Sequence, residues 1–131
     1  MSNKTNAVVK TNPRKAVMIG CGFVGSASVF ALMQSGLFSE IVLIDADKDK
    51  AEGEAMDISH GIPFARPMKI YAGGYDDVAD AAIIVVSAGA GQKPGETRLD
   101  LVNKMLQSSR ASFLRLQRET SVESYLSLQT L

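Results

Sequence analysis

The stretch of sequence that decides the fold is AVMIGCGFVG, residues 16–25. An apolar run typical of a strand ends at Gly20, and Gly20, Gly22 and Gly25 have the spacing G-x-G-x-x-G before a helix-like segment. In a nucleotide-binding turn the first glycine permits the bend, the second lets the backbone approach a pyrophosphate, and the third lets the helix pack on the strand. The helix N-terminus adds N–H donors and partial positive charge. The stretch therefore predicts a strand, a phosphate-binding turn and a helix.

A second strand-like run, IVLID at residues 41–45, ends in Asp45, twenty residues after Gly25. A carboxylate at this place can accept hydrogen bonds from both ribose hydroxyls of a dinucleotide, and it repels a 2′-phosphate. The position of Asp45 therefore favours NAD over NADP as the cofactor.

Length and composition limit the kind of protein. The 131 residues suffice for one domain with a core but not for two ordinary domains, and 46% of them are hydrophobic. With 14 basic and 14 acidic residues and no basic stripe, we expect no nucleic-acid partner. We also expect no membrane span, no metal site and no secretory signal in the polar residues 1–14. The single cysteine, Cys21, fits a reducing cytoplasm, and its place between two glycines indicates a backbone role rather than a reactive thiol.

The remaining elements alternate along the chain. After a flexible arm (residues 1–14 at most, ending near Pro13), we predict strands at 14–19, 41–45, 68–72 and 83–86, helices at 23–36 and 48–60, and a single helical turn at 76–79. Gly36 and Asp47 are the predicted helix caps. The predicted inward positions are Val24, Ala27, Ala31 and Leu32 in the first helix and Ala51, Ala55 and Ile58 in the second. This order predicts an α/β fold with a doubly wound parallel sheet, in which the apolar run 83–86 is buried on both faces.

Small residues at 87–91 follow the last predicted strand, at the edge where a dinucleotide would lie. They are either a close-approach surface for that ligand or ordinary turn residues. Next comes a polar loop, residues 92–98, with Gly91 and Gly95 as hinges. Such a loop could close over a substrate and exclude water, or it could be a solvated surface loop.

Four segments together resemble the N-terminal part of NAD-dependent L-lactate dehydrogenase, most closely the bacterial enzymes: residues 20–25, Asp45, MDISHG at 56–61 and AGAGQKPGETR at 88–98. The resemblance covers residues 15–104 and implies an incomplete Rossmann-type NAD-binding domain. It makes Arg98 the catalytic cation that polarises the substrate carbonyl, since a guanidinium stabilises charge that develops on the oxygen. It makes Gln92 the residue that contacts the substrate side chain. Malate dehydrogenases usually carry Arg there, so Gln92 favours pyruvate and lactate.

The resemblance also implies a set of cofactor-binding residues. They are Gly20, Gly22, Phe23, Val24, Gly25, Asp45, Lys50, Tyr75, Gly89 and Ala90. Lys50 is equally well a solvated charge on a helix, and Tyr75 is equally well a turn aromatic that covers the sheet. The only histidine, His60, matches a helix end of the family and not its catalytic acid, so we expect a capping or packing role.

The family's catalytic histidine and aspartate, and its carboxylate-binding arginine, have no counterpart in the sequence. The resemblance therefore implies a cytoplasmic enzyme of glycolysis and fermentation by descent, with pyruvate and lactate as substrates, whose chain is inactive alone. The alternative of another class is a non-catalytic dinucleotide-binding module; malate dehydrogenase is a third. Family members are commonly homotetramers, and many bacterial ones respond to fructose 1,6-bisphosphate, but we expect this chain not to assemble properly.

The tail, residues 105–131, departs from the family. We predict that a helix starts at Thr97 and carries Leu99 and Val102, but its apolar stripe is lost in the tail. The tail contains no Gly, Pro, Asn, Asp, Lys or Ile, so we expect it to be irregular or partly helical. A permitted back-translation, read one nucleotide earlier, gives NVAIFKSIIPEIAKRNFSGILLVVANP, which is the helix, turn and strand that the family expects. We therefore hypothesise that residues 105–131 arise from a one-nucleotide deletion after the codon of Lys104.

Overall fold

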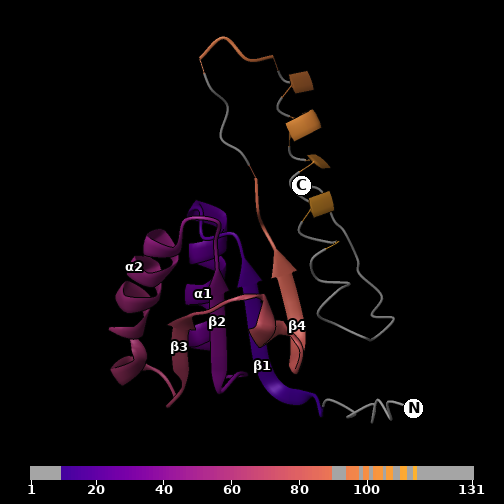
Figure 1. The fold of residues 1–131 in the computed structure, drawn as a ribbon. Helices are drawn as coiled ribbons and strands as arrows, with labels where there is room; N and C mark the ends of the chain where they lie inside the picture. Colours follow the sequence, from indigo (N-terminus) through magenta and orange to yellow (C-terminus); the bar gives the residue numbers. More distant parts are fainter. Residues whose placement is uncertain are drawn as a thin grey trace, which may run out of the picture.

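The computed structural model describes residues 10–89 and 94–97, with residues 99–100, 102–104, 106–107, 110–111 and 114 beyond them. Its centre is a sheet of four parallel strands in the order β3-β2-β1-β4 (Figure 1). The strands are β1 (Asn12–Ile19), β2 (Glu40–Ile44), β3 (Lys69–Ala72) and β4 (Ala81–Val86). The chain passes from β1 outward to β3 and then crosses back to pair β4 with the other side of β1. This arrangement is the truncated doubly wound sheet that the sequence predicts.

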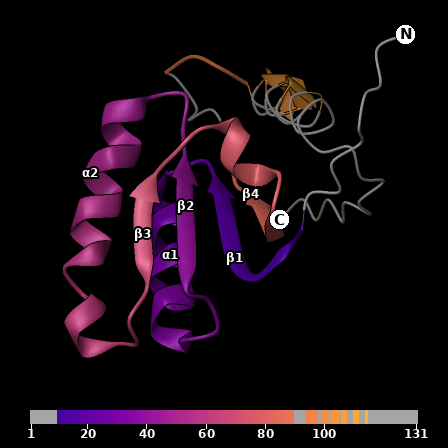
Figure 2. The ribbon, with the colours of Figure 1, turned by 60° about the horizontal axis from the view of Figure 1, so that its bottom comes forward.

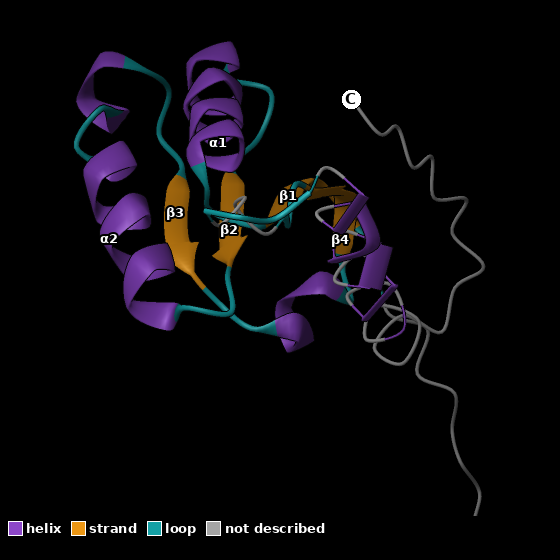
Figure 3. Ribbon diagram, turned by 90° about the horizontal axis from the view of Figure 1, so that it is seen from above, coloured by secondary structure: helices purple, strands orange, loops and turns teal. Residues whose placement is uncertain are grey.

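Two helices cover one face of the sheet, and a short turn covers the other (Figure 3). The helices are α1 (Phe23–Ser35) and α2 (Lys48–Ser59). A 3-10 turn, η1 (Ile62–Phe64), follows α2, and a second one, η2 (Tyr75–Val78), lies across the opposite face. None of the helices among the described residues combines the length and the apolar character needed to cross a membrane.

Alternation along the strands divides the core into two clusters. Ala16 and Met18 of β1 point toward the helices and pack with Val29 and Met33 of α1, all buried. Val17 and Ile19 point the other way and pack with the buried Val78 of η2. A parallel strand covered on both faces must be apolar at successive positions, which explains why residues 16–19 form an unbroken apolar run.

The predicted caps and the inner face of α2 are confirmed. Gly36 ends α1 in the left-handed region at φ 66°, and its N–H donates to the carbonyl of Met33. Asp47 caps α2, where its side chain accepts a hydrogen bond from the Lys50 N–H. The predicted inward residues of α2, namely Ala51, Ala55 and Ile58, are the buried ones.

The predicted face of α1 is wrong. Val24, Ala27 and Ala31 are exposed and Leu32 is half-buried, whereas the buried residues are Gly25, Val29 and Met33. The helix is apolar around most of its circumference, so periodicity alone did not distinguish the core face. The close approach of Gly25 to the glycine turn, described below, selects the face that packs on the sheet.

The start of β1 and the burial of β4 also differ from the prediction. β1 begins at Asn12, two residues before the predicted start at Arg14, so Asn12 and Pro13 of the predicted arm belong to the sheet. β4 forms an edge of the sheet beside β1 (Figures 1 and 2), and the Ile83 side chain is 46% exposed. The prediction that residues 83–86 are buried on both faces is therefore wrong for the four strands present. Among the described residues, no further strand pairs with the outer side of β4.

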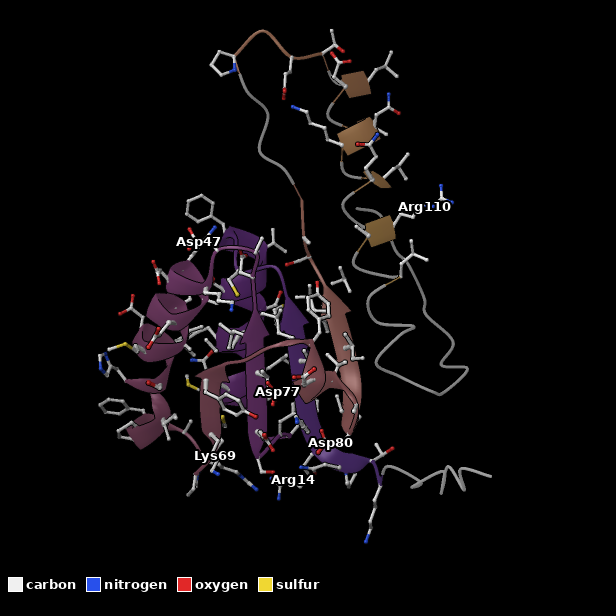
Figure 4. The ribbon with its side chains drawn as sticks, in the orientation of Figure 1. Arg14, Asp47, Lys69, Asp77, Asp80 and Arg110 are labelled. Carbon is white, nitrogen blue, oxygen red and sulfur yellow. The ribbon has the colours of Figure 1, made fainter. Side chains whose placement is uncertain are left out.

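A polar cluster ties η2 and the start of β4 to the sheet. Lys15 is 4% exposed, and its Nζ donates to Oδ1 of Asp80 at 2.6 Å and lies 3.7 Å from Oε1 of Glu40. Burial alone lowers the pKa of Lys15, but the hydrogen bond to Asp80 and the charges of Glu40 and Asp80 raise it overall. The Tyr71 hydroxyl donates to Glu40 at 2.6 Å. Figure 4 shows Asp77 and Asp80 toward the end of the sheet that is remote from Asp47.

Candidate dinucleotide-binding site

The glycine turn lies at the carboxyl ends of the strands, between β2 and β4. Gly20 follows β1, and its N–H continues the ladder by donating to the Ile44 carbonyl at 2.8 Å. Residues with a side chain rarely adopt its φ of 99°, and an added Cβ would lie 2.6 Å from the Ala88 nitrogen. Both its backbone angle and the approach of the residue after β4 therefore require glycine at position 20.

Gly25 brings α1 against the turn. A Cβ on Gly25 would lie 1.9 Å from the Gly20 carbonyl oxygen and 2.8 Å from Oγ of Ser87. No side chain fits in that space. The third glycine thus permits close packing of the helix on the end of the strand, as the sequence predicts.

Gly22 has the opposite environment. It is the N-cap of α1 with φ −74°, and a Cβ placed on it would meet no atom of the described residues within 4 Å, apart from its neighbours in the chain. No side chain hydrogen-bonds to this cap, and the first turn carries no acidic residue. Phe23 and Val24, next in sequence, are 98% and 68% exposed. The positive end of the α1 dipole therefore opens toward space that the described residues leave unfilled, which suits an anionic ligand.

Asp45 stands beside this opening and is half-buried at the end of β2. Its Oδ2 accepts the Cys21 N–H at 2.7 Å, and its Oδ1 accepts the Asp47 N–H at 2.9 Å. A carboxylate has about four acceptor positions, so each oxygen keeps capacity for a ribose hydroxyl. The contact with Cys21 joins the predicted ribose acceptor directly to the phosphate turn, and no local sequence pattern indicates it.

Ser87 approaches the turn from β4. Its N–H donates to the Ile19 carbonyl at 2.8 Å, and its Oγ donates to the Gly20 carbonyl at 3.0 Å. The small size of residues 87–91 predicts either a close-approach surface or an ordinary turn, and it does not indicate these hydrogen bonds of Ser87. Gly89 is exposed at the same edge, and Ala88 packs partly against the cluster around Val17.

The Cys21 thiol is completely buried. Burial, together with the negative charges of Asp45 and Glu54, raises its pKa to about 11. A thiol in this state is a poor nucleophile at neutral pH. The geometry agrees with the expected backbone role of this residue.

Three further candidates lie in different places. Lys50 is exposed on the first turn of α2, and Tyr75 begins η2 and packs partly against the sheet face around Val42. His60 is the exposed C-cap of α2, and its N–H donates to the Met56 carbonyl at 3.3 Å. Because α2 runs from the carboxyl edge of β2 back to the start of β3, His60 lies at the end of the sheet opposite the glycine turn. This position agrees with the capping role expected for His60.

Ala90, Gln92 and Arg98 lie outside the described residues. Around Arg98 the structure shows a reciprocal cap: the Thr97 N–H donates to Oδ2 of Asp100 at 3.1 Å, and the Asp100 N–H donates to Oγ1 of Thr97 at 3.3 Å. The Thr97 hydroxyl also donates to Oδ2 of Asp100 at 2.6 Å, and this hydrogen bond, together with the one from the Thr97 N–H, lowers the pKa of the Asp100 carboxyl. The helix that was predicted to start at Thr97 is present in the described residues that follow.

An open cavity of about 530 Å³ lies between α2 and β3. Asp45, Lys48, Gly73 and Gly74 line it, but none of the three turn glycines does. The opening at Gly22 is therefore separate from this cavity, and the two share only the neighbouring Asp45. Among the described residues, no three His, Cys, Asp or Glu side chains are grouped so that they could hold a metal ion.

Comparison with known proteins identifies relatives. The profile of the lactate/malate dehydrogenase NAD-binding domain matches residues 14–117. The chain is 59% identical over 101 residues to an L-lactate dehydrogenase of Priestia megaterium, covering 77% of the chain and 31% of that protein. It is 61% identical over 90 residues to one of Thermoanaerobacterium saccharolyticum, covering 69% of the chain and 29% of that protein. The chain thus spans about a third of the length of these curated relatives.

Solved structures give the same grouping. A minor L-lactate dehydrogenase of Enterococcus mundtii in a ligand-bound form superposes with a TM-score of 0.77 and 37% identity, covering 81% of this chain and 34% of that one. A malate dehydrogenase of Archaeoglobus fulgidus in complex with NADH superposes with a TM-score of 0.73 and 35% identity, covering 81% of this chain and 37% of that one. Both branches of dehydrogenase therefore share the fold of the described residues.

Proposed function

Because the chain belongs to the lactate/malate dehydrogenase NAD-binding domain family, we propose that it is the cofactor-binding part of an L-lactate dehydrogenase. The observation that carries the proposal is the open amino end of α1 at Gly22, with Asp45 beside it. The helix end supplies N–H donors and positive potential for a pyrophosphate, and Asp45 supplies acceptors for ribose hydroxyls. The residues present therefore fit NAD.

The reaction of the whole enzyme would be reversible hydride transfer between NADH and pyruvate, giving (S)-lactate, in the cytoplasm during fermentation. NADH supplies the hydride when it is bound. Arg98 would stabilise the charge that develops on the substrate carbonyl oxygen, and Gln92 would contact the substrate methyl side. The neutral side chain of Gln92 favours pyruvate over oxaloacetate, whose second carboxylate calls for a cation. Malate dehydrogenase remains the second candidate, since the fold is shared with that branch.

This chain alone lacks a proton donor for the reaction. Its one histidine, His60, is at the C-terminal end of α2, away from the glycine turn. We therefore expect no oxidation of lactate by the isolated chain. Because the resemblance implies an incomplete domain, we also expect NADH binding to be weak or absent. A non-catalytic dinucleotide-binding module has the same expected behaviour, and the lactate/pyruvate assignment depends on Gln92 and Arg98.

NADH titration followed by nicotinamide fluorescence tests the proposal, and the chain contains no tryptophan to interfere. We expect saturable binding that Gly22→Ala weakens at least tenfold, since the added methyl would occupy the open space at the helix end. Gly53→Ala is the matched control, because its Cβ also meets nothing within 4 Å but lies in α2. Equal affinity of the Gly22 variant and the control would contradict the proposed site. Addition of lactate or malate with NAD should give no NADH with either substrate.

A further inference from the structure

The backbone of the glycine turn is held by one side chain from each neighbouring strand. From β2, Asp45 accepts the Cys21 N–H at 2.7 Å. From β4, Ser87 donates to the Gly20 carbonyl at 3.0 Å. The Gly20 carbonyl and the Cys21 N–H belong to the same peptide group, so this group is held by a side chain from each of the two neighbouring strands.

We propose that Asp45 and Ser87 are positioning residues that hold the glycine turn open for a pyrophosphate, a role separate from the acceptance of ribose hydroxyls by Asp45. The proposal rests on the proposed function, since it concerns the same opening at Gly22. It adds two residues whose effect on phosphate binding passes through the backbone and not through contact with the ligand.

Three features make the two contacts suited to this role. Asp45 is itself fixed, because its second oxygen accepts the Asp47 N–H at 2.9 Å. Ser87 is fixed through its own N–H, which donates to the Ile19 carbonyl at 2.8 Å. The turn they hold contains Gly20 at φ 99°, and a glycine has many other conformations available when nothing restrains it.

The charge of Asp45 and its positioning role predict opposite effects on pyrophosphate binding when Asp45 is replaced. The Asp45 carboxylate stands beside an opening for an anion, so removal of its charge should strengthen the binding of inorganic pyrophosphate, which has no ribose. If Asp45 instead positions the turn, loss of the acceptor should weaken pyrophosphate binding. Asp45→Asn and Asp45→Ala remove the same charge, but only Asn keeps an oxygen that can accept the Cys21 N–H.

The test measures inorganic pyrophosphate and NADH binding by calorimetry for the wild-type chain, Asp45→Asn, Asp45→Ala and Ser87→Ala. Asp49→Ala and Ser35→Ala are matched controls, because Asp49 is exposed in the first turn of α2 and the Ser35 hydroxyl forms its hydrogen bonds with Leu32 and Leu37, at the end of α1. We expect Asp45→Ala to bind pyrophosphate at least fivefold more weakly than Asp45→Asn, and Ser87→Ala to bind it more weakly than Ser35→Ala. Pyrophosphate binding by Asp45→Ala that equals or exceeds that of Asp45→Asn would overturn the proposal.

Amide hydrogen exchange gives a readout that needs no ligand. We expect the Cys21 amide to lose protection in Asp45→Ala and to keep most of it in Asp45→Asn and Asp49→Ala. Unchanged protection of Cys21 in Asp45→Ala would refute the positioning role even if the chain binds NADH. Conversely, a chain that shows these exchange differences but binds neither NADH nor pyrophosphate would retain the positioned turn and refute the proposed function.

Discussion

Gly22 and Gly25, three residues apart, should lose very different amounts of stability when the same methyl group is added to each. In Gly25→Ala the new Cβ would lie 1.9 Å from the Gly20 carbonyl oxygen. A carbon and a carbonyl oxygen do not normally approach closer than about 3.3 Å. The turn and α1 must therefore separate by more than 1 Å. That movement disturbs the Ser87 contact at 3.0 Å and the packing of the helix on the sheet.

The expected cost for Gly25→Ala is about 3 kcal/mol, the upper end of the usual range for overpacking, because the obstacle is backbone and cannot rotate away. For a domain of this size that cost lowers Tm by roughly 12–24 °C. In Gly22→Ala the Cβ meets nothing and φ is −74°, so only the change of N-cap residue matters, at about 0.5–1 kcal/mol.

Urea unfolding followed by circular dichroism at low protein concentration measures both changes. Gly53→Ala serves as the reference, since an exposed helix-interior glycine with free space should gain about 1 kcal/mol on replacement by alanine. The order of stability should be Gly53→Ala, wild type, Gly22→Ala, then Gly25→Ala well below the others. If Gly25→Ala unfolds at the same urea concentration as Gly22→Ala, the result contradicts the close approach of α1 to the turn.

Four further outcomes are expected. Cys21 should resist alkylation by iodoacetamide in the folded chain and react with it in urea. Because the pKa of the thiol rises from 9.0 to about 11 on folding, its contribution to the stability of the folded chain should fall as pH rises through that interval. Fast alkylation of the native chain would contradict its burial. Lys15→Met should cost about 2 kcal/mol in urea unfolding, less than for a fully buried pair because Asp80 and Glu40 reach water, while the exposed Lys69→Met should cost little. The open edge at β4 should cause concentration-dependent association in sedimentation velocity, and a monodisperse chain at high concentration would count against it. Finally, DNA sequencing should show that one nucleotide is missing after the codon of Lys104. An uninterrupted reading frame in relatives of this gene that encode the same tail would contradict the frameshift hypothesis for residues 105–131. The family profile matches this tail as far as residue 117.

Local patterns in the sequence predicted local structure well. The strand–turn–helix at residues 16–25, the caps Gly36 and Asp47, and the inner face of α2 each depend on residues within a few positions of one another. The face of α1 was not predictable in the same way, because Val24 and Val29 are both apolar and only the packing partner distinguishes them.

The contacts that build the site are long-range, and for that reason the sequence did not reveal them. Cys21 and Asp45 are 24 residues apart, and Gly20 and Ser87 are 67 apart. The register of β1 against β2 and β4 sets both distances, and a hydroxyl or carboxylate at a strand end has no local signature of its partner. The sequence predicted that Asp45 lies at the cofactor edge, but not that it holds the turn.

The placement of β4 determines when during synthesis the phosphate turn can be completed. β1 and β2 can pair once about 45 residues have left the ribosome, since Ile19 lies opposite Ile44. Ile19 also lies opposite Val86, so the second strand that borders the turn becomes available only about 40 residues later, after α2 and β3 have formed. Until then the Gly20 carbonyl lacks its Ser87 donor and one side of β1 is an unpaired strand edge. A nascent chain that stalls within residues 50–80 would therefore carry a recognisable strand and helix but an unfinished turn, and that interval is where a chaperone has the most exposed edge to protect.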